Sequence, residues 1–190
     1  MPLTQHVADD EKMRELILLI AQASEGDAPF GATKLNKLLF YVDFIAYRQF
    51  GKSITGHEYQ RLPNGPAPRL MVPLTKSMES RRECVFADRR YFGKPLRRPI
   101  ALREPSLNAF SAAEVSLAHT LVKQCWGKTA REMSAYSHRF AGWRLAKAQE
   151  MIPYEVALVR RGPRNKSAEV HAASLAEQAR ECLQRVQDAG

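Results

Sequence analysis

Apolar residues recur at helical spacing along the segment from Thr33 to Gly51. The positions on one face are Leu35, Leu38, Leu39, Val42, Ile45, Ala46 and Phe50, and the surface is widened by Phe40, Phe44 and Tyr47. A helix that is apolar over most of its circumference is normally enclosed by several neighbours. The pattern therefore predicts a buried central helix, with Thr33 as its N-cap and Gly51 as the glycine that ends it.

Charged side chains occupy only a few positions on this central helix. The narrow remaining side carries Lys34, Lys37 and Arg48, whereas Asp43 stands within the apolar run. Because buried carboxylates are rarely left unpaired, the favoured interpretation of Asp43 is a hydrogen-bonding role, for example toward a backbone N–H. A catalytic or ligand-binding role is the alternative, and the segment alone does not decide between them.

The same periodicity predicts further helices. The first runs from Asp9 or Asp10 to about Ser24, with acidic residues at its start. Another, over residues 69–80, contains Pro73 and therefore either begins near that proline or is kinked there.

Two capping-box signatures predict two closely joined helices. Ser111-x-x-Glu114 opens the first, and Thr129-x-x-Glu132 opens the second, which extends to about His138. The pair has the outline of a helix-turn-helix, which ordinary helical domains share.

Extended structure is predicted in two places. Tyr59–Leu62 leads into a turn over residues 63–68, because Asn-Gly flanked by prolines is a turn signal. Residues 83–103 have the pattern of a β-hairpin with its turn at Gly93-Lys94-Pro95. With a last short helix over residues 144–151, these elements predict an α+β fold that is mainly α: a compact helical domain around the central helix, with a small antiparallel sheet or hairpin.

The C-terminal part of the chain differs in composition from the rest. Residues 160–166 are a predicted basic linker, and residues 167–187 have the pattern of an amphipathic C-terminal helix. That helix would pack on its own domain, pair with a second copy or hold a partner. We expect two parts, residues 1–160 and residues 161–190.

The net charge changes the range of expected partners. The 190-residue chain carries a formal charge of +9, which favours nucleic acid, an acidic protein or, less so, a membrane surface. The sequence has no apolar run of membrane-spanning length and no secretory signal at its N-terminus, so a cytoplasmic protein is expected.

The predicted hairpin is the most basic part of the chain. Its arginines are either solvated side chains that protect a sheet edge, or a docking surface for phosphate or carboxylate groups with aromatic anchors. The candidate partner-binding residues are Arg89, Arg90, Tyr91, Phe92, Arg97 and Arg98.

Metal binding and catalysis have little support in the sequence. The three cysteines are widely separated, and the five histidines show no metal-binding spacing. An active site would have to use Asp43, His57 or His138, and no motif links a nucleophile, a base and an orienting group. We therefore expect no metal, no cofactor, no catalytic residue and no enzymatic activity.

Two groups of residues carry a resemblance to a known family. The first group is Lys34-Leu35-x-Lys37-Leu38-Leu39-Phe40-Tyr41-x-Asp43 with Gly51, Ile54-Thr55-Gly56, Tyr59 and Leu62-Pro63-Asn64-Gly65-Pro66-x-Pro68. The second group is Ser134-x-x-Ser137-His138-x-x-x-x-Trp143 with Ile152-Pro153-Tyr154-Glu155-x-Ala157-Leu158. Over roughly residues 8–160 the chain resembles the Panacea domain, the SocA-like antitoxin family of prokaryotic and phage toxin–antitoxin operons.

This resemblance implies a binding protein that neutralises a cognate protein toxin, in some members by delivering it to a protease. It brings no catalytic residues with it. The motif residues expected to build the scaffold are Lys34, Leu38, Asp43, Tyr47, Tyr59, Asn64, Gly65, Pro66, His138 and Trp143.

The alternative function is a nucleic-acid-binding regulator that uses the basic hairpin as a wing. The expected partner is a cognate toxin, and a protease, a chaperone or a second copy of the chain are further candidates. Nucleic acid is less favoured, and a membrane partner is not expected. The sequence does not identify the toxin, distinguish occlusion from delivery to a protease, or fix the oligomeric state.

Overall fold

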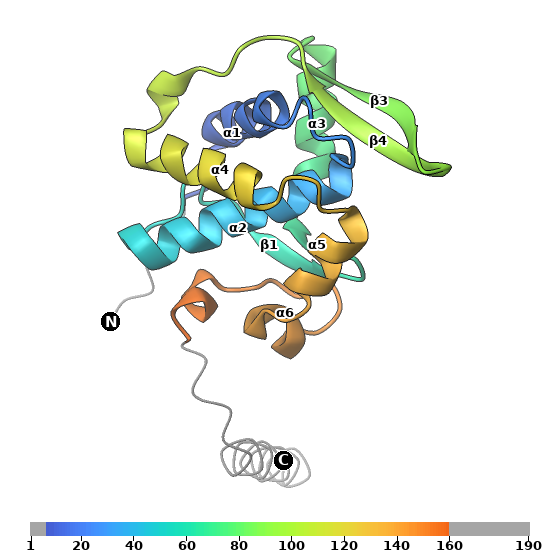
Figure 1. The fold of residues 1–190 in the computed structure, drawn as a ribbon. Coiled ribbons are helices and arrows are strands. Elements are labelled where there is room, and N and C mark those ends of the chain that lie inside the picture. The colour runs from blue at the N-terminus through green and yellow to red at the C-terminus, as the bar shows by residue number, and fades with distance from the viewer. Residues whose placement is uncertain (1–6, 160–190) are drawn as a thin grey trace, which may run out of the picture. The chain divides into compact units, whose positions relative to one another are not determined.

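The computed structural model describes residues 7–159, with α2 (Ala32–Phe50) at the centre of this part of the chain (Figure 1). By its contacts the chain divides into two units, residues 1–158 and 159–190. The predicted linker and C-terminal helix, residues 161–190, lie outside the described residues. Within the described part the fold is α+β and mainly α, as predicted, with six α-helices and two two-stranded antiparallel sheets.

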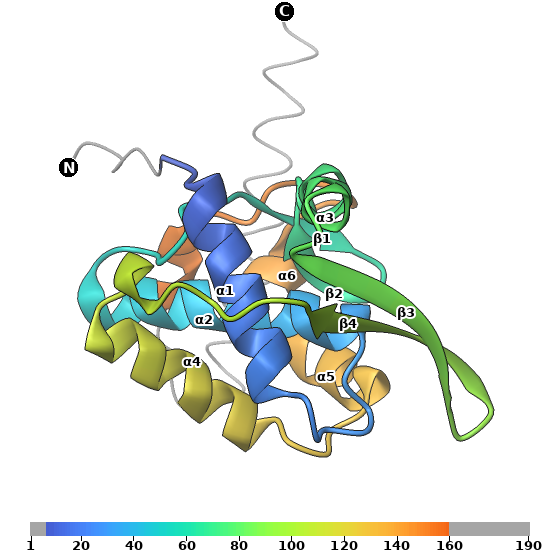
Figure 2. The same ribbon diagram turned by 90° about the horizontal axis from the view of Figure 1, so that it is seen from above.

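Neighbouring elements enclose α2 from several directions (Figures 1 and 2). α1 (Asp10–Ala23) and α4 (Ala112–Gln124) pack against α2 and against each other. β2 (Gly65–Pro68), α5 (Ala130–Ser137) and the 3₁₀ helix η2 (Tyr154–Leu158) also contact it. The predicted burial of the central helix is therefore confirmed, and its fully buried apolar side chains include Leu35, Leu38, Leu39, Phe40 and Val42.

The structure confirms the predicted end of α2 and corrects its predicted start. Gly51 ends the helix with a left-handed φ of 76°, and its N–H donates to the Tyr47 carbonyl at 3.0 Å, as expected. The predicted N-cap, Thr33, is wrong, because Gly31 occupies that position and its carbonyl accepts the first helical bond from Leu35 N. A Cβ on Gly31 would lie 2.4 Å from Leu96 Cδ1, so a distant strand leaves no room for a larger residue at this N-cap.

The side of α2 that carries Lys34 and Lys37 is not a solvent-facing edge. Both side chains are only 1% exposed. Lys34 Nζ lies 2.5 Å from Asp27 Oδ2 and donates to the Lys128 carbonyl at 2.8 Å, while Lys37 Nζ donates to the Pro66 carbonyl at 2.8 Å. These amino groups therefore join α2 to three other segments of the chain.

The first sheet is formed by β1 (Tyr59–Leu62) and β2, which pair from Tyr59↔Pro68 to Leu62↔Gly65. Residues 65–68, predicted as part of the turn, are thus a strand, and only Pro63 and Asn64 connect the two strands. All four residues of β2 are buried, because the strand packs on α2 and α5.

The second sheet is the predicted basic hairpin, formed by β3 (Cys84–Tyr91) and β4 (Lys94–Ala101). Its turn consists of Phe92 and Gly93, which have φ values of 46° and 74°. Two consecutive positive φ angles suit the twist of a two-residue hairpin, so the strands extend further than predicted. Pro95, predicted as a turn residue, is the second residue of β4.

The remaining predicted helices before residue 140 are present. Pro73 is the third residue of α3 (Met71–Ser80), so this helix begins near the proline, where a missing N–H costs little. Both capping boxes are formed: Ser111 and Glu114 cap α4, and Thr129 and Glu132 cap α5. The 3₁₀ helix η1 (Leu107–Ala109) precedes α4.

The helix predicted over residues 144–151 is wrong, since α6 spans Ala141–Leu145 and residues 146–151 are not helical. Backbone hydrogen bonds to β1 take the place of helical ones. Gln149 N donates to the Arg61 carbonyl at 2.9 Å, Arg61 N to the Glu150 carbonyl at 2.9 Å, and Ile152 N to the Tyr59 carbonyl at 2.7 Å. Pairing with a strand far away in sequence therefore overrides the local helical pattern.

Candidate functional site

Residues 88–97 form the end of the β3–β4 hairpin that lies farthest from the core, and we call them the distal hairpin. It extends away from the helices as a two-stranded arm (Figure 2). The side chain of Phe92 at its tip is 87% exposed, and its ring meets that of Tyr91 edge-on with a centroid distance of 4.7 Å. A phenylalanine this exposed stabilises no core, so the tip leaves apolar surface open to solvent.

Positive charge predominates along the distal hairpin. Its four cations, Arg89, Arg90, Lys94 and Arg97, are all exposed, and Asp88 is its one acid, so its formal charge is +3 (four minus one). Within the described part of the chain, the one ion pair of these residues joins Arg97 to Glu79 at 3.8 Å, and the Arg97 guanidinium lies 5.1 Å from the centre of the Phe86 ring. Exposed pairs of this kind contribute little to stability, so the charge is available to a partner.

Arg98 is separated from the other candidate arginines. Its guanidinium donates to the carbonyls of Ser24 at 3.2 Å and Asp27 at 2.9 Å, and also to that of Glu25. These carbonyls follow the C-terminal end of α1, where a cation is favourable. Arg98 therefore fastens the base of the hairpin to the helical domain, and we leave it out of the candidate surface.

A hollow of about 720 Å³ lies between the distal hairpin and the first residues of α2 and α5. The charged residues that contribute to its lining are Asp88, Arg89, Arg90 and Arg97. Its other walls are the start of α2 and apolar residues of β4 and α5, namely Gly31, Ala32, Thr33, Pro95, Leu96 and Ala130. Folding thus adds helix residues to the basic surface that the sequence indicated, and no local motif reveals them.

Asp43 is fully buried and accepts four hydrogen bonds from one neighbouring segment. Oδ1 accepts from the backbone N–H groups of Ile54 and Thr55, both at 2.8 Å, and Oδ2 accepts from the Thr55 hydroxyl at 2.5 Å and the Tyr59 hydroxyl at 2.7 Å. Burial raises the pKa of Asp43, and the bonds from Thr55, Tyr59 and Ile54 oppose that increase. The carboxylate ties α2 to residues 54–59 and has no access to a substrate.

Aromatic side chains surround this junction. The rings of Phe40, Phe44 and Tyr59 contact one another with centroid distances of 4.3–5.6 Å. The ring centroids of Tyr47 and Tyr154 lie 5.6 Å apart. Burial raises the pKa of the Tyr59 and Tyr154 hydroxyls, so both stay neutral near pH 7.

The Asn64-Gly65-Pro66 motif lies against Lys37 of α2. A Cβ on Gly65, whose φ is +98°, would lie 2.2 Å from Ser137 Oγ and 2.7 Å from Lys37 Cε. Ser134 Oγ also donates to the Asn64 carbonyl at 2.9 Å. Burial lowers the pKa of Lys37 to about 8. The motif therefore packs β2 on α2 and α5.

The two histidines considered for an active site are held in packing positions. His138 stacks on Trp143 with a centroid distance of 3.9 Å, the guanidinium of Arg61 covers the same indole at 4.5 Å, and Trp143 Nε1 donates to the Leu62 carbonyl at 3.0 Å. His57 is 2% exposed, and its Nε2 lies 3.2 Å from Asp10 Oδ1. No group of acidic, histidine and cysteine side chains that could hold a metal ion occurs among residues 7–159.

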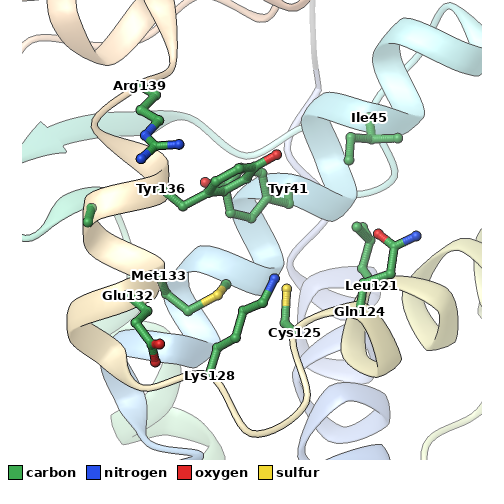
Figure 3. Close-up of a pocket in the computed structure, with 11 residues that line it drawn as sticks. Tyr41, Ile45, Leu121, Gln124, Cys125, Lys128, Glu132, Met133, Tyr136 and Arg139 are labelled. Atoms are coloured by element: carbon green, nitrogen blue, oxygen red, sulfur yellow. The ribbon is translucent and has the colours of Figure 1, made fainter.

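A second hollow, of about 390 Å³, lies between α2, α4 and α5 (Figure 3). The Tyr41 hydroxyl is buried without a hydrogen-bond partner in the described part of the chain, and its ring lies beside that of Tyr136 at 5.6 Å. Burial raises the pKa of Tyr41. Tyr41 belongs to the central-helix motif, but nothing in the sequence indicated that folding would place it at a hollow.

The family comparison matches residues 35–144 to the model described as antitoxin SocA-like, Panacea domain. The chain belongs to the Panacea family of SocA-like antitoxins. The matched residues include most of α2, both hairpins, the helices α3 to α5 and most of α6. Residues 152–158, which also carried the resemblance, lie beyond the match.

Membership indicates an antitoxin role for this Panacea-domain protein, with a toxin as the general class of partner. Searches of curated proteins and of solved structures found no match. Among the described residues no helix has the length and apolar character needed to cross a membrane.

Proposed function

We propose that this Panacea-domain protein binds and neutralises a cognate protein toxin, and that the distal hairpin makes the central contact. The side chains that take part are Arg89, Arg90, Tyr91, Phe92 and Arg97. The observation that carries this proposal is the exposure of Phe92, which is 87%, at the end of an arm that projects from the helices.

The distal hairpin is rich in the residue types that contribute most binding energy at protein interfaces. Aromatic side chains and arginines are enriched among residues whose loss costs the most binding energy. Phe92 and Tyr91 supply apolar area, and Arg89 and Arg90 supply planar donors that pair with carboxylates. An aromatic tip flanked by arginines thus suits a protein surface that is partly apolar and partly acidic.

Neutralisation follows one of two routes from the same complex. The antitoxin covers the part of the toxin that acts on its target, or it delivers the toxin to a protease, with or without a chaperone. The amount of toxin in the cell separates the routes, because occlusion leaves the toxin level unchanged and delivery lowers it.

Co-expression with the product of the adjacent gene tests the proposal. Arg89→Glu with Arg90→Glu reverses two charges on the arm, and we expect rescue from toxicity and toxin pull-down both to be lost. Arg48→Glu with Lys52→Glu is the matched control, because these exposed cations lie at the C-terminal end of α2, away from the arm (Figure 1).

Three results are decisive. Loss of rescue in the arm variant and its retention in the control support the proposal. Equal rescue by the two variants excludes the distal hairpin as the toxin-binding surface. No binding and no rescue by the wild-type chain excludes the adjacent product as its toxin.

A further inference from the structure

We propose that an extended segment of the protein partner adds to the outer edge of β3 as a third strand, an inference that rests on the proposed function. The segment pairs with the backbone of Asp88 and Arg90, and its acidic side chains meet the arginines of the distal hairpin. The name open edge is used for the backbone of residues 88–90 on the side of β3 that faces away from β4.

The turn of the hairpin fixes which backbone groups point out of the sheet. Tyr91 and Lys94 flank the two-residue turn and therefore form a hydrogen-bonded pair. Bonded and non-bonded pairs alternate along an antiparallel ladder. The N–H and C=O groups of Arg90 and Asp88 therefore point away from β4, whereas those of the intervening Arg89 bond to it.

Two observations agree with this alternation. Pro95 and Pro99, which have no N–H to give to the ladder, both fall at outward-facing positions of β4. On β3 the outward-facing N–H of Phe86 donates to Glu79 Oε1 of α3 at 3.1 Å, outside the sheet. The first outward position of β3 beyond this bond is Asp88.

The edge of β4 is closed to a further strand. Its two prolines remove outward donors, because proline has no N–H. The start of α2 lies against the same edge, since a Cβ on Gly31 would lie 3.4 Å from the Arg97 carbonyl oxygen. Strand addition is therefore left to the other side of the hairpin.

The edge of β3 is open over the distal hairpin. β3 packs on α3 near its first residues, and its distal part extends beyond that helix (Figure 2). Among residues 7–159 no backbone group bonds to the N–H of Asp88 or of Arg90. The Asp88 carbonyl accepts from Arg89 Nη1 at 3.4 Å, a long and exposed contact that an N–H of another strand can replace. Unpaired groups of this kind are a template for strand addition.

Charge decides which strand fits the open edge. A second copy of β3 can pair there about a two-fold axis centred on Asp88, Arg89 or Arg90. Each of these registers sets the central residue directly opposite its own copy, so like charges meet across the strands. The distal hairpin, with its formal charge of +3, instead attracts a strand of opposite charge. The arginines thus exclude a second copy and admit an acidic partner.

The register also indicates the composition of the partner strand. Arg89 and Arg90 point to opposite faces of the sheet, so a strand beside them meets both with two successive acidic residues, one on each face. Tyr91 and the 87%-exposed Phe92 come next along the hairpin and favour an apolar or β-branched neighbour. The segment that fits is an extended stretch in which two successive acidic residues are flanked by β-branched ones.

The decisive pair of variants is Arg90→Pro and Arg90→Ala. Both lose the same guanidinium, but only proline removes the outward N–H that the added strand needs. Arg90 stands opposite Pro95 in a pair that exchanges no hydrogen bonds, so Arg90→Pro leaves the ladder of the hairpin intact. Any difference between the two variants therefore reports the backbone rather than the charge.

The probe is the peptide acetyl-Thr-Val-Glu-Glu-Val-Thr-amide, whose sequence reads the same in both directions and so presents the same side chains to a parallel or an antiparallel partner. It is titrated into the labelled 190-residue chain while NMR follows the exchange of backbone amide protons with water. At saturation we expect exchange at Asp88 and Arg90 to slow at least about tenfold, because their N–H groups enter hydrogen bonds. Exchange at Arg97, which faces outward on β4, should not change.

Two comparisons isolate the backbone contribution. The same peptide with both glutamates N-methylated keeps its charge but loses its central donors, and we expect it to leave exchange at Asp88 and Arg90 unchanged. We expect Arg90→Pro to bind the unmodified peptide at least about tenfold more weakly than Arg90→Ala, because the outward N–H is absent.

Several outcomes overturn the inference. Exchange that the peptide leaves unchanged, equal slowing by the N-methylated peptide, or equal peptide binding by Arg90→Pro and Arg90→Ala each excludes strand addition. Exchange at Asp88 and Arg90 that slows as the protein concentration rises, without peptide, assigns the open edge to a second copy instead.

The toxin separates this inference from the proposed function. If the wild type neither binds the adjacent gene product nor rescues from it, but the peptide results are as expected, the toxin assignment fails and the open edge stands. If the wild type binds the toxin, and Arg90→Pro binds it as tightly as Arg90→Ala, the toxin assignment stands and the inference fails. Weaker toxin binding by Arg90→Pro than by Arg90→Ala supports both.

Discussion

Cationic side chains occur both on α2 and on the distal hairpin, but they meet different surroundings. Lys34 and Lys37 are buried, and their amino groups reach Asp27 and two backbone carbonyls. Arg89 and Arg90 are exposed and have no carboxylate partner in the described residues. The buried lysines of α2 therefore connect segments of one chain, whereas Arg89 and Arg90 on the distal hairpin face solvent. We expect changes on α2 to affect folding and changes on the arm to affect binding.

Asp43→Ala is expected to have the largest effect on stability. It leaves four buried donors without an acceptor, and we expect the free energy of unfolding to fall by roughly 3–5 kcal/mol. Urea denaturation followed by circular dichroism measures this loss. Asp43→Asn is the control and should lose less, because it keeps an oxygen for Ile54 N and Thr55 N. A loss below about 1 kcal/mol for Asp43→Ala would contradict the role given to this carboxylate.

Gly65→Ala and Gly93→Ala compare the interior with the arm directly. Both glycines have positive φ, but a Cβ on Gly65 meets Ser137 Oγ at 2.2 Å, whereas one on Gly93 meets nothing within 4 Å. We expect Gly65→Ala to lower the free energy of unfolding by roughly 2–4 kcal/mol and Gly93→Ala by about 1 kcal/mol. Equal losses in thermal or chemical denaturation would show that backbone strain alone, rather than packing, sets the cost.

The lowered pKa of Lys37 on α2 predicts that the free energy of unfolding depends on pH. Burial lowers its pKa in the folded state to about 8, below the value of roughly 10.4 in an unfolded chain. Between these two values the unfolded chain binds more protons, so the contribution of Lys37 to stability rises with pH. From pH 7 to 9.5 we expect the wild type to gain about 2 kcal/mol relative to Lys37→Met. Denaturation of both proteins across this range measures the difference, and parallel curves would mean that Lys37 stays charged in the fold.

Phe92→Asn is expected to have the smallest effect on stability and a clear effect on binding. Asparagine tolerates the positive φ of 46° better than phenylalanine, so we expect stability to stay constant or to rise by up to about 0.5 kcal/mol. Toxin binding should weaken at least about tenfold, because the exposed ring is lost. Unchanged toxin pull-down with this variant would move the contact away from the tip.

Local chemistry accounts for the parts of the fold that the sequence predicts. Capping boxes at Ser111 and Thr129, the glycine at the end of α2 and the alternation in β3 and β4 each act within a few residues. These elements were placed almost as they occur. The helix expected over residues 144–151 failed because Gln149, Glu150 and Ile152 bond to a strand ninety residues earlier.

The site follows the same division. The basic and aromatic residues of the hairpin tip are visible as a cluster in the sequence, and the structure leaves Arg89 and Phe92 exposed; their binding of a partner stays a prediction. The position of Arg98 depends on the end of α1, and that of the hollow beside the distal hairpin depends on α2 lying beside β4. Contacts between residues this far apart in the sequence leave no local pattern, so the sequence grouped Arg98 with the hairpin tip and did not place Thr33 at a hollow.

The attachment of Arg98 affects which substitutions the hairpin tolerates. Its guanidinium donates to main-chain oxygens after α1, which every amino acid supplies, so the attachment itself does not depend on the side chains of Ser24, Glu25 and Asp27. Residues 88–95 lie farther out along the hairpin than Arg98, so we expect substitutions there to leave the helical domain intact. Substitutions at the end of the hairpin therefore need not alter the contacts that hold the helical interior together.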